Sequence, residues 1–259
     1  MNIQADDNWW QDLFDEIYLM TDARSVCDEK LTCQEVDFLE ETLDLDKSAS
    51  ILDLCGGQGR HSLELSRRGY KNITVLDYSK YLIDLGKGRA REEGLNTIFI
   101  QGDARNTGLP GQSFQFIIIM ASSFGYFANE GENKKILNEA FRLLTPGGTL
   151  LLDLPGRDYV LQNFKPFSRH KVNEDITVSR ERELGDDIIY SRETVMSKKG
   201  GCIRDSTYCT RLYSPEKIAD FMYSAGFLSV ICKRNFMNRE AEGDYGCMTN
   251  RMLVTAKKI

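Results

Sequence analysis

A glycine-rich turn directly after a short apolar run constrains the fold of this chain more than any other feature. Residues 51–60 read Ile-Leu-Asp-Leu-Cys-Gly-Gly-Gln-Gly-Arg, which predicts a strand, a tight turn and the start of a helix. Glycine adopts positive φ easily and lets a ligand approach the backbone, and a helix N-terminus presents free N–H groups. Such a turn suits a nucleotide-like ligand or a carboxylate, but glycine-rich turns also serve ordinary packing between a strand and a helix.

Short apolar runs alternate with helical patterns from residue 49 to residue 154, and this alternation predicts a mostly parallel, doubly wound α/β sheet. Helices are expected at residues 60–68, from the N-cap Ser79 to residue 93, and along the apolar stripe from 136 to 144. A Ser-Pro-Glu helix start at residue 214 resumes the pattern near the end of the chain. The sheet is expected to have seven strands, at residues 50–54, 72–76, 97–101, 114–120, 149–154, 227–234 and 251–257.

The stretch from residue 177 to residue 213 breaks this rhythm. It contains three runs that favour strand over helix, separated by Gly-Asp-Asp at 185–187 and Lys-Gly-Gly at 199–201, which suit hairpin turns. We therefore expect an antiparallel β insertion lying over the sheet. Large apolar side chains gather in the N-terminal segment and predict a helical lid or brace. The expected organisation is an N-terminal helical lid (1–47), a core (48–162 and 214–259) and an inserted antiparallel sheet (163–213).

Acidic residues follow the first three predicted strands of the sheet, at the edge where ligands bind in open α/β folds. Asp77 can accept hydrogen bonds from a ribose, although nicotinamide-dependent enzymes also place an acid there. Asp103, after the third strand, suits an exocyclic amino group such as that of adenine. Asp53 stands where a pyrophosphate would prefer no acid, and Ser62 replaces the third glycine of the dinucleotide fingerprint. A cationic, amino-bearing adenosyl ligand, S-adenosylmethionine, fits these features better than a dinucleotide.

The chain resembles the class I S-adenosylmethionine-dependent methyltransferases, in particular a small-molecule-type branch of bacteria and archaea. Their Asp-x-Gly-x-Gly-x-Gly motif aligns with residues 53–59, except that Cys55 replaces the first glycine. Cysteine tolerates positive φ less readily than glycine. Asp77 matches the family's ribose-binding acid and Asp103 its adenine-contacting acid, while Pro-Gly-Gly at 146–148 matches the turn before the fifth strand. The resemblance implies the seven-stranded Rossmann-like methyltransferase fold and S-adenosylmethionine as cofactor.

The resemblance also implies a set of site residues. An N-terminal tyrosine reaches the cofactor in related enzymes with an inserted sheet, which favours Tyr18. The residues expected to bind the cofactor are Tyr18, Asp53, Cys55, Gly56, Gly57, Gly59, Asp77, Tyr78, Asp103, Ala104 and Ala121. Those expected to line an acceptor pocket are Ser123, Phe124, Tyr126, His170, Tyr208 and Arg211, with His170 in the loop after the fifth strand. For the aromatic residues in both sets, packing in the core or the lid is an equally good interpretation.

No catalytic residue is evident. His61 follows the glycine turn on the helix, where packing or capping explains it better than catalysis. Cys55 is not expected to act as a nucleophile, because nothing nearby lowers its pKa. An amine acceptor would need no strong base, since its proton can pass to water.

Composition narrows the class of protein further. The net charge of −6 disfavours a nucleic-acid partner, and no apolar run is long enough to span a membrane. Seven cysteines without a Cys-x-x-Cys pair, and two histidines, disfavour a metal site such as zinc. The odd cysteine count and the absence of a signal peptide predict reduced thiols in the cytoplasm. We expect a monomer or homodimer.

The leading hypothesis is methyl transfer from S-adenosylmethionine to a nitrogen or oxygen of a small molecule by in-line displacement. The alternatives are a methyltransferase acting on a macromolecule and a non-catalytic S-adenosylmethionine-binding module. Against the macromolecular alternative, the fourth strand is followed by Ala-Ser-Ser-Phe at 121–124 rather than by an Asn-Pro-Pro-Tyr type of motif.

Overall fold

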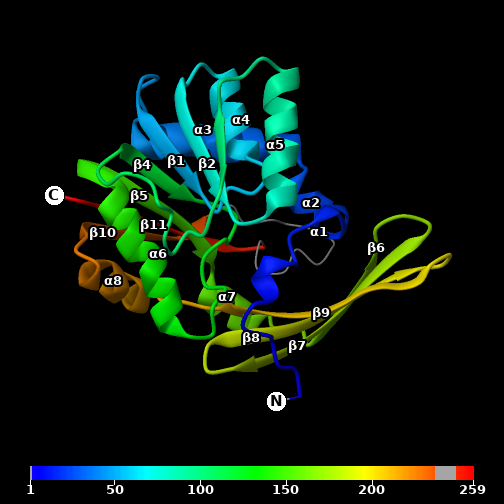
Figure 1. The fold of residues 1–259 in the computed structure, drawn as a ribbon. Coiled ribbons are helices and arrows are strands. Elements are labelled where there is room, and N and C mark those ends of the chain that lie inside the picture. The colour runs from blue at the N-terminus through cyan, green and yellow to red at the C-terminus, as the bar shows by residue number, and fades with distance from the viewer. Residues whose placement is uncertain (1, 237–248) are drawn as a thin grey trace.

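The computed structural model describes residues 2–236 and 249–259, and its main sheet has seven strands in the order β10-β11-β5-β4-β1-β2-β3. Strands β5, β4, β1, β2 and β3 are parallel, whereas β11 is antiparallel to both β5 and β10. The predicted doubly wound, mostly parallel sheet is therefore confirmed (Figure 1). The strands are β1 (Ser50–Leu54), β2 (Asn72–Asp77), β3 (Ile98–Gln101), β4 (Phe114–Ile119), β5 (Leu144–Pro155), β10 (Leu228–Phe236) and β11 (Arg251–Lys257).

Helices cover both faces of this sheet. On one face, α3 (Glu29–Leu43), α4 (Arg60–Arg67) and α5 (Lys80–Glu92) pack against alternate strand residues such as Ile51 and Val75. On the other, α6 (Glu130–Leu143) and α8 (Pro215–Ser224) cover Leu52, Leu54 and their neighbours. Because successive side chains of a strand point to opposite faces, strands covered on both faces have to be apolar at nearly every position, as the sequence predicted.

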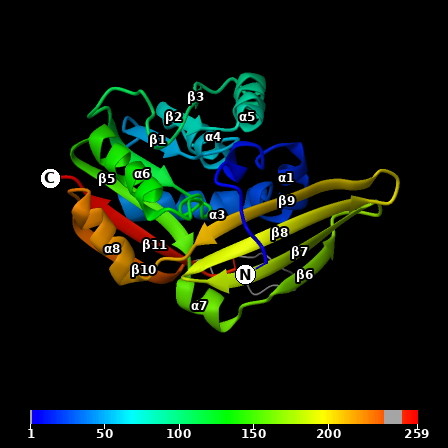
Figure 2. The same cartoon turned by 60° about the horizontal axis from the view of Figure 1, so that its bottom comes forward.

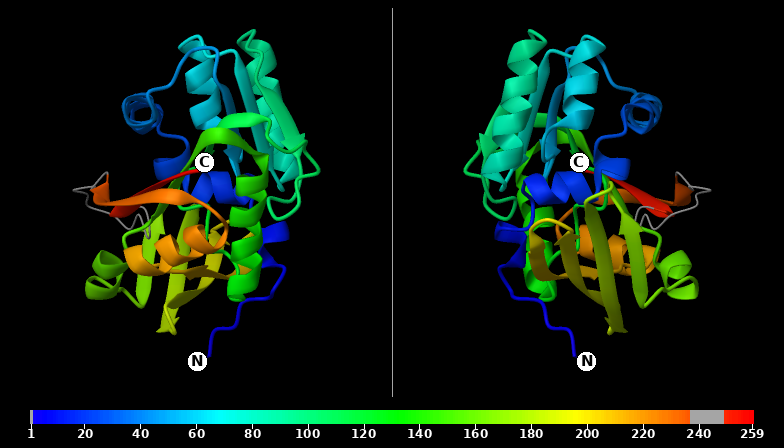
Figure 3. Two further views of the ribbon diagram at one scale, coloured as in Figure 1. Left: turned by 90° about the vertical axis from the view of Figure 1, so that its left-hand side faces the viewer. Right: turned by 90° about the vertical axis from the view of Figure 1, so that its right-hand side faces the viewer.

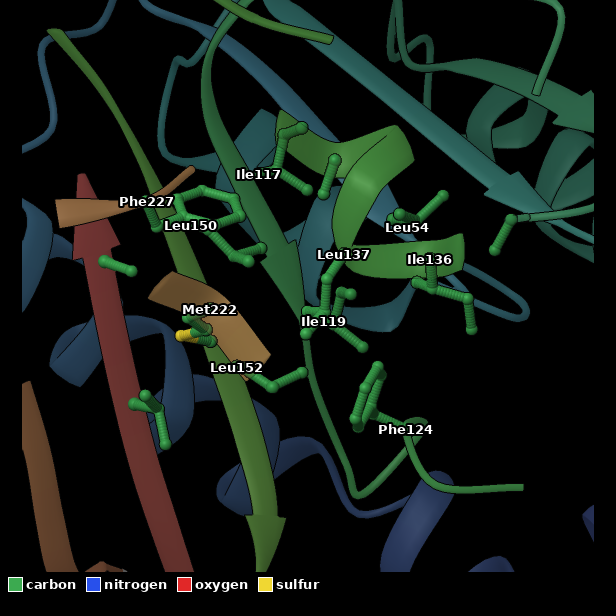
Figure 4. Close-up of a cluster of buried hydrophobic side chains, with 14 of the residues drawn as sticks. Leu54, Ile117, Ile119, Phe124, Ile136, Leu137, Leu150, Leu152, Met222 and Phe227 are labelled. Atoms are coloured by element: carbon green, nitrogen blue, oxygen red, sulfur yellow. The ribbon is translucent and has the colours of Figure 1, made fainter. Parts of the chain in front are cut away.

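The larger core lies under α6 and α8 (Figure 4). Leucines and isoleucines of β1, β4 and β5 meet Ile136 and Leu137 of α6 and Met222 of α8 there. Phe124, which follows β4, is completely buried in the same cluster. Burying side chains of this size contributes about 1.5–3 kcal/mol each, so the core fixes the end of β4 from which the next loop starts.

Side-chain caps set the helix starts where the sequence predicted them. The hydroxyl of Ser79 accepts from the backbone N–H of Leu82 at the start of α5, and Ser214 caps α8 in the same way, followed by a proline. One turn differs from expectation. Thr-Pro-Gly-Gly at 145–148 lies inside β5, as a bulge where pairing with β4 shifts register between Leu144 and Thr149.

The insertion is a separate antiparallel sheet in the order β6-β7-β8-β9 (Figure 2). The two predicted hairpin turns connect β7 to β8 and β8 to β9. The strands of the insertion are β6 (Phe167–Lys171), β7 (Ile176–Gly185), β8 (Ile188–Ser197) and β9 (Gly201–Arg211), preceded by the short helix α7 (Arg157–Gln162). The expectation of three strands was wrong by one, because β6 is too short and polar to show in the sequence. His170 accordingly lies on β6 and not in a loop.

The N-terminal segment has two parts. Residues 9–26 form the short helices η1 (Trp9–Gln11), α1 (Glu16–Thr21) and α2 (Ala23–Val26), which Figures 1 and 3 place between the main sheet and the insertion. The longer α3 instead packs on the main sheet, with Val36 and Leu39 fully buried. The helical prediction is confirmed, but α3 belongs to the core packing. The domain boundaries given above stay a prediction.

No helix in the described ranges is long and apolar enough to cross a membrane. The six cysteines at described positions are free thiols, and Cys247 lies outside those positions.

Candidate active site

A cavity opens at the carboxyl ends of β1, β2, β3 and β4, the edge at which the sequence predicted a ligand. It measures about 1010 Å³ when the space open to solvent at its mouth is included. Ten of the eleven residues expected to bind the cofactor line it: Tyr18, Asp53, Cys55, Gly56, Gly57, Asp77, Tyr78, Asp103, Ala104 and Ala121. Their contact with the cofactor itself stays a prediction.

The glycine-rich turn forms the floor of the cavity. Cys55 has a φ of 60°, so cysteine occupies the left-handed conformation for which the family motif carries glycine. Gly59, the eleventh residue, does not line the cavity. It begins α4 with a φ of 72°, and a Cβ there would lie 2.7 Å from the ring of Phe99. Its role in this structure is therefore to let α4 pack closely on the sheet.

Asp53 is completely buried below the turn. One carboxylate oxygen accepts from the hydroxyl of Ser62 at 2.8 Å, and the other, Oδ1, has no hydrogen-bond partner. Burial raises the pKa of Asp53 to about 7. An unpaired buried carboxylate oxygen in the lining of a cavity is costly unless a ligand supplies a donor, and a cationic amino group would do so.

Asp77 and Asp103 hold the next two positions along the edge. The carboxylate of Asp77 accepts from the backbone N–H of Gly57 at 2.8 Å and from that of Ser79 at 2.8 Å, and burial raises its pKa. Burial also acts to raise the pKa of Asp103, but hydrogen bonds from the Arg105 side chain and backbone outweigh it and lower the pKa. Asp103 is thus ionised and already paired, while Asp77 joins the turn to the start of α5.

The first turn of α4 brings charged residues to the same cavity. His61 lines it, but its Nε2 bonds to the buried carboxylate of Glu35 at 2.9 Å, and burial lowers the His61 pKa to about 4. Arg60 pairs with the same carboxylate. The ring of His61 is therefore neutral at pH 7 and held in place, which agrees with the packing role that the sequence favoured.

The charge network of Glu35 continues to the end of β4. Arg251 of β11 donates to Glu35 and, at 2.5 Å, to Asp153 of β5, and Asp153 accepts from the backbone N–H of Ala121 at 2.8 Å. Ala121 has a φ of 58°, a strained value for alanine. A chain of buried groups thus holds in place a residue that lines the cavity.

Four aromatic side chains, called the aromatic wall below, also line the cavity. Trp10 and Phe14 come from the N-terminal segment, and Tyr126 and Phe127 from the loop after β4. The rings of Phe14 and Tyr126 stack with centroids 5.5 Å apart, and Phe14 meets Tyr18 edge-on at 5.0 Å. Of the four residues of this wall, only Tyr126 was predicted from the sequence to bind a methyl acceptor.

Two of the six predicted acceptor residues, Ser123 and Tyr126, line the cavity. The other four do not. Phe124 is buried in the core, and His170 lies on the outer strand β6. Tyr208 packs behind the wall against Trp9, and the Arg211 guanidinium donates to the carbonyl of Ala128. Tyr208 and Arg211 are three residues apart on β9 and therefore face opposite sides of the strand, so neither side of β9 brings these residues to the cavity.

Several lining residues were not proposed from the sequence. Two of these, Trp10 and Phe14, lie eight and four residues before the predicted Tyr18, a spacing that could have indicated a common surface. Gln58 gave no such signal. Its amide donates to the carbonyl of Val26 at 2.8 Å and so ties the glycine turn to α2, a contact between segments that no local pattern encodes.

The site fits S-adenosylmethionine. The unpaired oxygen of Asp53 suits the amino group of the methionine part. Gly56 lets the turn lie directly against this acid, since a Cβ there would lie 2.6 Å from the carboxyl carbon of Asp53. The acids at the ends of β2 and β3 suit the ribose and adenine. Among the described residues, no group of three or more His, Cys, Asp or Glu side chains could hold a metal ion.

Comparisons with known proteins point to a methyltransferase domain. Residues 51–148 match the model of a methyltransferase domain. The chain is 25% identical to the protein YqeM of Bacillus subtilis over 188 residues, 71% of this chain and 75% of that protein. It is 30% identical to the demethylmenaquinone methyltransferase of Listeria welshimeri over 123 residues, 44% of this chain and 50% of that enzyme. The chain thus spans about half the length of that relative.

Solved structures share the fold over nearly the whole chain. An S-adenosylmethionine-dependent methyltransferase from Clostridium acetobutylicum superposes with a TM-score of 0.72 at 18% identity, covering 93% of this chain and 96% of that one. The sugar N-methyltransferase KedS8 from Streptoalloteichus superposes with a TM-score of 0.64 at 18% identity, covering 95% of this chain and 94% of that one. Fold and site together define a methyltransferase. Residues 51–148 form a methyltransferase domain, and the chain has the fold of solved S-adenosylmethionine-dependent methyltransferases.

Proposed function

We propose that the protein methylates a nitrogen or oxygen of a small-molecule acceptor held between the N-terminal helices and the loop after β4. The observation that carries this proposal is the aromatic wall, which Trp10 and Phe14 contribute from one side and Tyr126 and Phe127 from the other. Two chain segments that close over a cavity leave room for a compact acceptor rather than for an extended polymer. The sugar N-methyltransferase KedS8 and the demethylmenaquinone methyltransferase, both similar to this chain, support an acceptor of this size.

When bound, S-adenosylmethionine supplies a methyl group activated by its positive sulfur. Asp53, Asp77 and Asp103 would hold this cofactor, and its methyl group would pass to a lone pair of the acceptor while the sulfur kept the electron pair of the broken carbon–sulfur bond. The protein's part is to align the two reactants, which can contribute about 7–11 kcal/mol to lowering the barrier. Aromatic faces near the acceptor also stabilise positive charge.

The acceptor is expected to bring its own nucleophile, as a neutral amine does. His61 is tied to Glu35, and burial raises the pKa values of Tyr18 and Cys55 well above their usual values. None of these groups is prepared to take a proton at pH 7. A nitrogen acceptor therefore suits the site better than a hydroxyl, whose proton has to be removed.

Ligand-induced stabilisation tests the cofactor assignment. S-adenosylmethionine and its demethylated product are expected to raise the melting temperature by roughly 5–10 °C at a hundredfold excess over Kd, and NAD to leave it unchanged. Asp77→Ala should abolish the shift, with Asp84→Ala on the exposed side of α5 as its control. A shift with NAD instead would contradict the assignment.

Measuring methyl transfer by the protein tests which class of acceptor it uses. Methyl-labelled S-adenosylmethionine is incubated with fractionated small metabolites and, in parallel, with protein and nucleic acid from the same cells. Label in small molecules supports the proposal. Label in polymer identifies a macromolecular methyltransferase, and binding without any label transfer identifies a non-catalytic binding module.

A further inference from the structure

The inserted sheet contributes no residue to the lining of the cavity as the structure describes it, since every lining residue lies between positions 10 and 136. The predicted acceptor residues of the insertion, His170, Tyr208 and Arg211, are all outside it. The insertion nevertheless packs closely on the N-terminal helices (Figure 2). The insertion can therefore influence the cavity through the N-terminal helices, which it contacts directly.

Helix α1 faces the insertion and the cavity at once. Ile17 and Met20 pack on a buried cluster formed by Ile176, Val178 and Val195 of β7 and β8. Tyr18 and Leu19, between them in sequence, line the cavity. A six-residue helix is too short to be stable by itself, so its position depends on the surface below it.

Three buried charged side chains, one from each of β7, β8 and β9, hold α1 on that surface. Arg180, Glu193 and Arg204 have side chains only 6%, 4% and 6% exposed. Nε of Arg180 donates to Glu193 at 2.7 Å. Glu193 thus lies beside two arginines whose remaining N–H groups are free to reach the N-terminal segment.

The two arginines bind the two ends of α1. Arg204 donates to the carboxylate of Asp15 and, at 3.2 Å, to the carbonyl of Leu13. Asp15 is the N-cap of α1 and accepts from the backbone N–H of Tyr18 at 3.1 Å. Arg180 donates at 2.9 Å to Asp22, the residue that ends α1.

We infer that Arg180 and Arg204 are positioning residues for methyl transfer, which set α1, and through it Tyr18 and Phe14, against the cofactor and acceptor. The inserted sheet is then a brace for the lid rather than a wall of the acceptor pocket. This inference rests on the proposed function for its catalytic meaning. The brace itself can be tested without any acceptor.

Substitutions on the lid side test the brace while Arg180, Glu193 and Arg204 of the insertion are all kept. In Asp15→Asn/Asp22→Asn both ion pairs are lost, while asparagine keeps the N-cap of α1 and Glu193 still neutralises an arginine. Both tryptophans of the chain, Trp9 and Trp10, lie in η1 and pack on lid and loop aromatics, so tryptophan fluorescence reports the lid specifically.

We expect the double variant to show emission at longer wavelength and stronger acrylamide quenching than wild type, with the same far-ultraviolet circular dichroism. If the lid is in place in about a tenth of the molecules, the affinity for S-adenosylmethionine weakens about tenfold. The matched control is Asp205→Asn, one residue from Arg204, which loses an ion pair with Arg192 whose partners are 42% and 51% exposed. It should leave fluorescence and affinity unchanged.

Unaltered fluorescence and affinity in the double variant would overturn the inference, as would equal changes in Asp205→Asn. Arg204→Lys adds a second arm, because lysine keeps the charge but not the two-pronged contact with Asp15 and Leu13; it should change fluorescence in the same direction. Failure of the proposed function is distinguishable, since wild type would then transfer no methyl label to small molecules, while the fluorescence of the variants and their affinity for S-adenosylmethionine still reported on the brace.

Discussion

Gly56 lies against the carboxyl group of Asp53, so that a Cβ at position 56 would be 2.6 Å from the carboxyl carbon and 2.8 Å from either oxygen. The contact is between the turn and the buried acid that precedes it. Asp53 is fixed in turn by Ser62, so it cannot move away at low cost. The turn can therefore pack against the carboxyl group of Asp53 because residue 56 has no side chain.

Gly56→Ala should abolish binding of S-adenosylmethionine while the protein still folds. The added methyl group must displace Asp53 or the turn, and overpacking of this kind typically costs about 1–3 kcal/mol of stability. Isothermal titration with S-adenosylmethionine measures the effect. The control is Gly88→Ala on α5, where a Cβ would meet nothing within 4 Å. Wild-type affinity in Gly56→Ala would show that the ligand does not use this turn.

Affinity for S-adenosylmethionine should fall as the pH is lowered from 8 to 6. Burial raises the pKa of Asp53 to about 7 in the free protein, so below that pH the carboxyl is protonated and must lose its proton to bind a cationic amino group. Below this pKa, the affinity should fall about tenfold for each unit by which the pH is lowered. Titration calorimetry at several pH values measures it. Asp53→Asn should bind weakly with no such slope, and a flat wild-type profile would contradict the assignment.

Glu35→Gln should destabilise the fold strongly. The carboxylate is fully buried and accepts from Arg60, His61 and Arg251, so the substitution leaves buried cations underpaired at a cost of about 3–5 kcal/mol. The melting temperature should drop by roughly 6–20 °C. Glu41→Gln, exposed on the same helix, should change it little.

The free energy of unfolding measured at acid pH gives a second test of the role of Glu35. Burial acts to raise its pKa, but Arg60, His61 and Arg251 outweigh burial and hold the pKa well below the usual range. A lowered pKa stabilises the folded state above the unfolded value, and this contribution is lost as the pH falls below it. Glu35→Gln should therefore lose less stability than wild type between pH 5 and pH 3. Parallel profiles would show that the network does not act through this charge.

Cys55→Gly should keep the protein stable and able to bind S-adenosylmethionine, whereas Cys55→Val should destabilise it by more than about 1 kcal/mol. The reason is the φ of 60° at this position, which glycine adopts freely and a β-branched residue does not. Urea unfolding of both variants measures the difference. Equal stability of the two would mean that the turn relaxes to another conformation.

Much of the fold could be predicted from the sequence because its causes are local. The bounds of β1 and β11 matched residue for residue, since an uninterrupted apolar run between breakers has few alternatives. The starts of α5 and α8 followed from Ser79 and Ser214, whose side chains cap the helices that begin beside them. The cofactor edge was predictable for the same reason, because in a parallel sheet the residue after each strand necessarily comes to one edge.

The acceptor end of the site was not predictable in this way. Whether β9 contributes to the cavity, and whether Phe124 points to the core or to the cavity, depends on how the insertion and the loop after β4 dock. Glu35 and Arg251 are 216 residues apart in the chain, yet they meet beside the cavity. The sequence by itself determined the sheet, the glycine turn and the cofactor acids, because each is set by neighbours along the chain. Only the tertiary structure decided the charge network and the lid's support, because buried charges have to find partners wherever packing brings them.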